Sequence, residues 1–261
     1  IVFGDWSSDV CSSDLYVEPY LFATALLRAA VARGVRCTSA EVTRIVADAG
    51  TVCGIELADG STLAADVVVN AAGAWANRLS VDLDLPLPMA PVRSQYWISE
   101  PAPSFARYGA IVLMPAIRAY ARPEVGALLF GIRERQPAVA DARRLPADLA
   151  GFVFDPDDAD GWANLAEGAD ELAPYFPGLN TLGIAHYLTG PSNYTPDRQL
   201  VLGAAPQIAG LFVASGCNGS GISFAGGVGR LIGELIRGAA PFVDPQPSAP
   251  GRRGVFDPYA P

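Results

Sequence analysis

Three glycines near the end of the chain have the spacing of a ligand-binding turn. A short apolar run at 211–215 is followed by Gly216, Gly219 and Gly221, and an amphipathic helical pattern begins directly after them. Because glycine has no side chain, a flat or anionic ligand can approach the backbone of such a turn closely. The first N–H groups of the helix form a positive dipole end that favours negative charge. This pattern predicts either a binding turn between strand and helix or a tight turn with no ligand.

A second candidate block, residues 66–77, joins an apolar run to small residues and then to Trp75. The run at 66–70 is typical of a parallel strand that is buried on both faces. Small residues such as Ala72 and Gly73 at the carboxyl end of such a strand leave open the crevice in which α/β sheets bind cofactors. The block therefore predicts a binding crevice at a strand end.

Together with residues 16–20 and 195–203, these blocks resemble the D-amino-acid oxidase superfamily of FAD-dependent oxidoreductases, in the family's order and spacing. The resemblance covers nearly everything from Tyr16 to Gly238. Within the family, residues 190–197 are most similar to the branch of dimethylglycine and sarcosine dehydrogenases. The resemblance implies an enzyme that uses FAD to take a hydride from the carbon next to an amine nitrogen, giving an imine that hydrolyses. The implied partners are a small secondary or tertiary amine, or an amino acid, and an electron acceptor, either oxygen or an electron-transfer protein.

The same resemblance assigns roles to individual residues, with Thr43 and its neighbour Val42 placed where the family's strand touches the adenine end of FAD. The substrate candidates are Arg93, Tyr187 and Tyr194. No catalytic residue is singled out, and no metal site is expected. The expected cofactor-binding residues are Val42, Ala72, Gly73, Trp75, Gly216, Asn218, Gly219, Ser220, Gly221 and Ile222.

Two departures from the family pattern concern the substrate. Ser192 stands where glycine-oxidase-like members have a carboxylate-binding arginine, and Ser223 stands where sarcosine-oxidase-like members have a lysine. Neither serine carries a fixed positive charge, so we expect secondary or tertiary amines to be preferred over primary D-amino acids. Arg93 and Arg118 are possible substitutes, and they are alternatively solvated charges at strand edges.

The start of the chain departs from the family most. Residues 5–15 resemble one reading frame of a sequencing adapter, so residues 1–15 are excluded from fold reasoning as a foreign leader. The G-x-G-x-x-G turn that should cradle the FAD pyrophosphate does not occur before Tyr16. We therefore expect an N-terminally truncated fragment of an FAD-dependent enzyme, inactive on its own.

The bulk composition excludes several classes of protein. The 261 residues carry a net charge of −9, which disfavours nucleic acid and anionic membranes as partners. No apolar run approaches the roughly 18 residues of a membrane span. The four cysteines are far apart and His186 is the only histidine, which argues against zinc and disulfide frameworks and favours a cytoplasmic protein.

The elements predicted around these blocks give an α/β fold. It comprises a Rossmann-like FAD domain lacking its first βαβ unit, interrupted by an antiparallel-sheet substrate domain. The domain boundaries are 1–15 (leader), 16–84 and 191–240 (FAD domain), 85–190 (substrate domain) and 241–261 (extended tail). A helix is expected from Pro19 to Gly34, with an apolar face at Phe22, Ala25, Leu26, Ala29 and Ala30. Further helices are expected around 157–172 and after 221, and strands at 35–46, 51–57, 62–64, 66–70, 92–99, 111–115, 118–122, 127–132, 200–202 and 210–215.

Two other functions remain open, and two more are excluded because the residues that they need are missing from the motifs. An FAD-linked dehydrogenase of a hydroxy acid or sugar alcohol is an alternative, and so is a non-catalytic flavin-fold subunit. Residues 219–221 do not form the G-x-S-x-G turn of a hydrolase. The aspartates at 155–158 lack the glycine and the closing glutamate of a calcium loop.

Overall fold

The computed structural model describes residues 17–105 and 109–252, and the chain divides into two compact units. The predicted leader at 1–15 lies outside the described residues, as do residues 253–261. Unit 1 comprises Ile1–Gly34, Ser94–Pro137 and Val153–Gly190, and unit 2 comprises Val35–Arg93, Ala138–Phe152 and Pro191–Pro261. Among the helices of the described ranges, none has the length and apolar character needed to cross a membrane.

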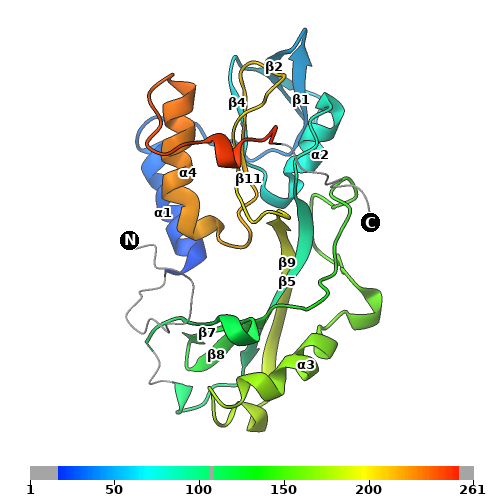
Figure 1. Ribbon diagram of the computed structural model, residues 1–261, viewed down its shortest axis with the longest axis vertical. Helices are drawn as coiled ribbons and strands as arrows, with labels where there is room; N and C mark the ends of the chain where they lie inside the picture. Colours follow the sequence, from blue (N-terminus) through cyan, green and yellow to red (C-terminus); the bar gives the residue numbers. More distant parts are fainter. Residues whose placement is uncertain (1–16, 106–108, 253–261) are drawn as a thin grey trace. The chain divides into compact units, whose positions relative to one another are not determined.

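Unit 2 contains two three-stranded sheets (Figure 1). The first has the antiparallel order β1-β2-β3, with bounds Val42–Asp48, Thr51–Leu57 and Thr62–Ala64. The second has the order β10-β11-β4, with bounds Val201–Ala204, Leu211–Ser215 and Val68–Asn70. In this second sheet β10 is antiparallel and β4 is parallel to β11. After β4 come the 3-10 turn η1 (Gly73–Trp75) and the short helix α2 (Ala76–Ser80), and after β11 comes the helix α4 (Gly221–Ile236).

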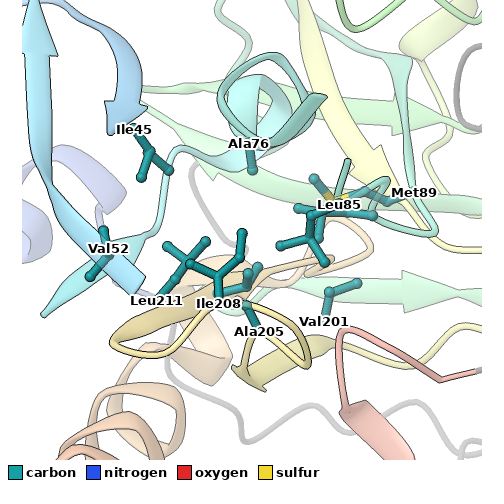
Figure 2. Close-up of a cluster of buried hydrophobic side chains, with 11 residues drawn as sticks. Ile45, Val52, Ala76, Leu85, Met89, Val201, Ala205, Ile208 and Leu211 are labelled. Atoms are coloured by element: carbon teal, nitrogen blue, oxygen red, sulfur yellow. The ribbon is translucent and has the colours of Figure 1, made fainter. Parts of the chain in front are cut away.

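The core of unit 2 takes apolar side chains from both sheets. Ile45 and Val52 come from the hairpin β1-β2, and Leu211 and Val213 come from β11; all four are fully or almost fully buried. Figure 2 shows Ile45, Val52 and Leu211 reaching into one cluster with side chains of the neighbouring loops. Burial of each such side chain contributes about 1.5–3 kcal/mol. This packing fixes the position of β11 and of the turn that follows it.

Unit 1 contains a five-stranded antiparallel sheet in the order β6-β7-β8-β5-β9. The bounds are β5 Ala90–Ser99, β6 Val112–Met114, β7 Ala119–Glu124, β8 Ala127–Ile132 and β9 Ile184–Tyr194, with β5 and β9 extending into unit 2. The helix α3 (Trp162–Leu172) is joined to β8 by a hydrogen bond of 2.8 Å from Asn164 Nδ2 to the carbonyl of Ile132. Trp97, Phe130 and Leu172 lie at the centre of this unit's core.

Most predicted elements are present, and the α/β fold class is confirmed. Strands β2, β3 and β8 have their predicted bounds. The first strand begins at Val42 instead of residue 35, because the ladder with its partner β2 ends at the pair Val42 and Leu57. Beyond that pair a single backbone hydrogen bond follows, from the N–H of Ala58 to the carbonyl of Glu41 at 3.0 Å. Strand β9 was not predicted, since its sequence contains Gly190 and Pro191, which are atypical of strand interiors.

One predicted burial pattern, that of residues 66–70, is wrong, and the apolar face of the first helix is not buried among the described residues. Val67, which precedes β4, and Val69 within it are 42% and 39% exposed, and Val69 lines an open cavity of unit 2. The helix α1 (Pro19–Val31) forms as predicted, with Pro19 in the first turn and the Glu18 carboxylate accepting a hydrogen bond from the N–H of Leu21. Its predicted apolar face, however, contains no buried residue.

Candidate functional site

The parallel pairing of β4 with β11 places the two predicted blocks at one edge of the sheet (Figure 1). Val68 is opposite Leu211 and Asn70 is opposite Val213, so both strands end in the same direction. The Ser215 hydroxyl, at the end of β11, donates a hydrogen bond of 3.1 Å to the carbonyl of Gly73. Two segments that are 142 positions apart in the sequence are therefore joined directly at this edge.

The loop after β4 is held by the side chain of Asn70, which is almost fully buried. Its amide donates to the carbonyl of Ala76 at 2.9 Å and to the Ser80 hydroxyl at 3.0 Å, and its oxygen accepts from the N–H of Ala72 at 3.3 Å. Gly73 has a φ of 56°, a left-handed conformation that glycine adopts without strain. The loop is consequently fixed from within.

A cavity of about 520 Å³ lies in unit 2 beside this loop. Its volume is within the range of roughly 300–1,000 Å³ that is usual for small-molecule sites. Glu41 and Arg78 are its charged lining residues, and their side chains lie 3.5 Å apart. The apolar lining includes Val42, Ile45, Ile55, Val68, Ala72 and Trp75.

Trp75 is fixed at the wall of this cavity by a long-range contact. Its indole Nε1 donates a hydrogen bond of 2.8 Å to the carbonyl of Pro146, 71 positions along the chain. The polar end of the ring is therefore satisfied, and its apolar surface remains available to the cavity.

The turn after β11 has a backbone that few residues can adopt. Gly216, Asn218 and Gly219 have φ angles of 71°, 51° and 79°. A β-carbon at Gly216 would lie 2.7 Å from Val201 Cγ2, and one at Gly219 would lie 2.9 Å from the Tyr194 hydroxyl. The contact with Val201 excludes a side chain at Gly216, whereas at Gly219 the left-handed φ favours glycine and the neighbour is the mobile end of the Tyr194 side chain.

The helix α4 starts immediately after this turn, at Gly221. Ser220 occupies the N-cap position, but its side chain makes no capping hydrogen bond. The N–H groups of Gly221, Ile222 and Ser223 have no partner within the helix. They form a positively polarised end at the edge of the sheet, and Ile222 and Ser223 are exposed there.

Side-chain amides brace the turn. Asn193, which is 6% exposed, accepts from the N–H of Cys217 at 2.9 Å and donates to the Ser215 hydroxyl at 2.8 Å. Asn218 donates to the carbonyl of Gly216 at 2.8 Å and accepts from the N–H of Thr195 at 2.9 Å.

Two titratable groups near the turn have shifted pKa values. Partial burial raises the pKa of the Cys217 thiol, so the neutral thiol dominates at neutral pH. A two-point contact with the Arg252 guanidinium, at 2.6 and 3.0 Å, lowers the pKa of Asp197 to about 2. Arg252 follows the 3-10 turn η7 (Gln246–Ser248), so part of the predicted extended tail is fixed on residue 197.

The predicted substrate residues are divided between the two units. Arg93 belongs to unit 2 and is 8% exposed, so it is not a solvated charge at a strand edge. Tyr187 belongs to unit 1, where its hydroxyl donates to Gln95 Oε1 at 2.7 Å and its ring lies 5.7 Å from that of Trp97. Tyr194 lies beside Gly219 in unit 2.

The predicted cofactor residues form two groups at one sheet edge. Val42, Ala72 and Trp75 line the cavity, and Gly73 is joined to the second group through Ser215. Residues 216–222 form the turn and the helix start and do not line the cavity.

The sequence reasoning missed Asn70, Asn193 and Ser215, although Asn70 and Ser215 are each the last residue of a strand. It also missed the charged lining residues. Among the described residues no cluster of potential metal ligands is present.

Comparison with known proteins places this geometry in a family. The profile of the family described as "FAD dependent oxidoreductase" (DAO) matches residues 5–235. The chain is 29% identical to mitochondrial sarcosine dehydrogenase of Mus musculus over 231 residues, covering 84% of this chain and 24% of that protein. It is 33% identical to glycine oxidase of Pseudomonas putida over 215 residues, covering 82% of this chain and 53% of that protein. The chain thus spans from about a quarter to about half of the length of these relatives.

Among solved structures, glycine oxidase from Geobacillus kaustophilus superposes with a TM-score of 0.69 at 26% identity, covering 88% of this chain and 57% of that chain. The similarity in structure agrees with the match of the family profile to most of the sequence. The chain belongs to the DAO family of FAD dependent oxidoreductases.

Proposed function

We propose that unit 2 holds FAD at the edge where β4 and β11 end. The observation that carries this proposal is the cavity of about 520 Å³ at the end of β4, next to a turn and helix start joined to it through Ser215 and Gly73. Apolar walls fit a flat ring system, and the N–H groups at the start of α4 fit a group that carries negative charge. The residues present therefore suit FAD, with Val42, Ala72 and Trp75 on one side and 216–222 on the other.

In the proposed reaction a hydride leaves the carbon next to an amine nitrogen, and the cofactor, when bound, supplies the group that accepts it. The contribution of the protein is to position groups and exclude water. The N–H groups of Gly221 and Ile222 would stabilise negative charge, because fixed donors need not reorient when that charge develops. Unit 1, with its antiparallel sheet, is the proposed substrate part.

The proposed substrate is a small secondary or tertiary amine. Ser192 is half-buried and Ser223 is exposed, and neither can supply a fixed positive charge for the carboxylate of a primary amino acid. The similarity to sarcosine dehydrogenase supports this choice. A cytoplasmic location is proposed because Cys37 and Cys53 are exposed free thiols, which suit a reducing compartment.

An anaerobic titration of the full-length protein tests the function. We expect bound flavin in the purified protein and bleaching of its visible absorbance by sarcosine or dimethylglycine, with slower bleaching by D-alanine. Faster bleaching by D-alanine would contradict the proposed substrate class, and bleaching by a 2-hydroxy acid alone would contradict amine oxidation. Absence of any flavin would contradict the proposed cofactor site.

A further inference from the structure

We propose that Asn193 and Asn218 are positioning residues that hold the turn 216–220 in the shape in which α4 presents its first N–H groups to the cofactor. The inference deepens the FAD site proposed above and rests on it. It assigns a role to side chains that need not touch the cofactor themselves.

Within the described residues 216–220 the turn has a single backbone hydrogen bond of its own. Gly216, Asn218 and Gly219 are left-handed, and the backbone hydrogen bond closing the turn runs from the N–H of Ser220 to the carbonyl of Cys217 at 2.8 Å. Left-handed residues in succession do not continue into regular structure. Other contacts must therefore select this conformation.

The two asparagines supply those contacts with both ends of their amides. Asn193 uses its oxygen for the N–H of Cys217 and its nitrogen for Ser215. Its backbone carbonyl also accepts from the N–H of Asn218 at 3.1 Å. Asn218 uses its nitrogen for Gly216 and its oxygen for Thr195. Each of the residues 215–218 is therefore held by at least one bond that involves an asparagine.

The same network reaches the other loop of the site. Ser215, which accepts from Asn193, donates to the carbonyl of Gly73 beside the cavity. A change at either asparagine therefore shifts the start of α4 relative to the loop after β4. Fixed donors lose their effect on a developing charge when their geometry relaxes.

Replacement of Asn218 by glycine separates this role from backbone preference. Asn218→Gly removes all three hydrogen bonds of the Asn218 amide, two from Thr195 and one to Gly216, but adopts a φ of 51° more readily than asparagine does. The matched control is Ala49→Gly, at a φ of 46° in the exposed β1-β2 turn. If a left-handed backbone were all that Asn218 provides, both variants would behave alike.

The readouts are the Kd for FAD and the two-electron midpoint potential of the bound flavin, both measured on the full-length protein. For Asn218→Gly we expect at least tenfold weaker binding, or a tenfold weaker preference for the reduced form, which is a midpoint potential about 30 mV lower. The melting temperature should fall below that of Ala49→Gly because three hydrogen bonds are lost, so the Kd and the potential of both variants are measured well below their melting temperatures. Thr195→Val, which removes a hydroxyl 3.2 Å from Asn218 Oδ1, gives a second comparison if Asn218→Gly does not fold.

The outcomes separate this inference from the function on which it rests. If Asn218→Gly has the same Kd for FAD and the same potential as Ala49→Gly, the positioning role is overturned. The proposed function still stands in that case, provided that the wild-type protein binds FAD. A wild-type protein without FAD would overturn both.

Discussion

Replacement of Gly216 by alanine is expected to destabilise unit 2 by about 2–5 kcal/mol, as the sum of two contributions. The φ of 71° costs an L-residue about 1–2 kcal/mol relative to glycine. The added β-carbon would lie 2.7 Å from Val201 Cγ2 and 2.8 Å from Val201 N. Val201 is fully buried within β10, so it cannot move away cheaply, and overpacking of this kind costs about 1–3 kcal/mol.

The matched control for this substitution is Gly60→Ala. Gly60 has a φ of 82°, but a β-carbon added there would meet nothing within 4 Å, so only the backbone cost of about 1–2 kcal/mol remains. Urea unfolding followed by far-UV circular dichroism gives the free energy of unfolding of both variants. Equal losses at Gly216 and Gly60 would refute the close packing of the turn against β10.

Two further predictions concern stability. Asn77→Ala should lower the free energy of unfolding in urea by about 2–4 kcal/mol, because the fully buried amide makes hydrogen bonds with the N–H and carbonyl of Leu87 and with the carbonyl of Met89. The control Asn180→Ala, at an exposed position, should change the stability little, and a loss at Asn77 no larger than that of the control would contradict the role of these hydrogen bonds. Asp197→Asn should lower the free energy of unfolding by less than about 1 kcal/mol, and the melting temperature slightly, because the carboxylate is 44% exposed. The folded pKa of Asp197 is depressed, so this contribution is complete above pH about 4 and is lost as the pH falls through about 2. An undiminished difference from wild type below pH 2 would exclude the ion pair as its cause.

Much of the secondary structure and the two site blocks could be predicted from the sequence. Apolar runs of strand length, bounded by turns such as Asp59-Gly60, give β2 and β3 with their bounds because these signals are local. The strand-to-helix turn at Gly216 is likewise visible from its glycines and the amphipathic helix that follows. The family resemblance required these blocks only in their order and spacing.

Pairing and burial could not be read from the sequence, because they depend on which segments become neighbours. The apolar run of β4 suggests burial on both faces, but Val69 is exposed and lines a cavity whose walls come from segments far apart in the chain. Tyr187 and Tyr194 look alike as pocket aromatics, yet one bonds Gln95 in unit 1 and the other lies over Gly219 in unit 2.

The sequence by itself determined where the chain forms strands, turns and helices, and which family pattern these follow, because such signals lie in neighbouring residues. Only the tertiary structure decided that Ser215 meets Gly73 and that Asn193 holds the turn after β11. Those bonds join residues far apart in the chain. Their polar side chains carry no periodic signal, and their partners are largely backbone groups that are the same in every residue.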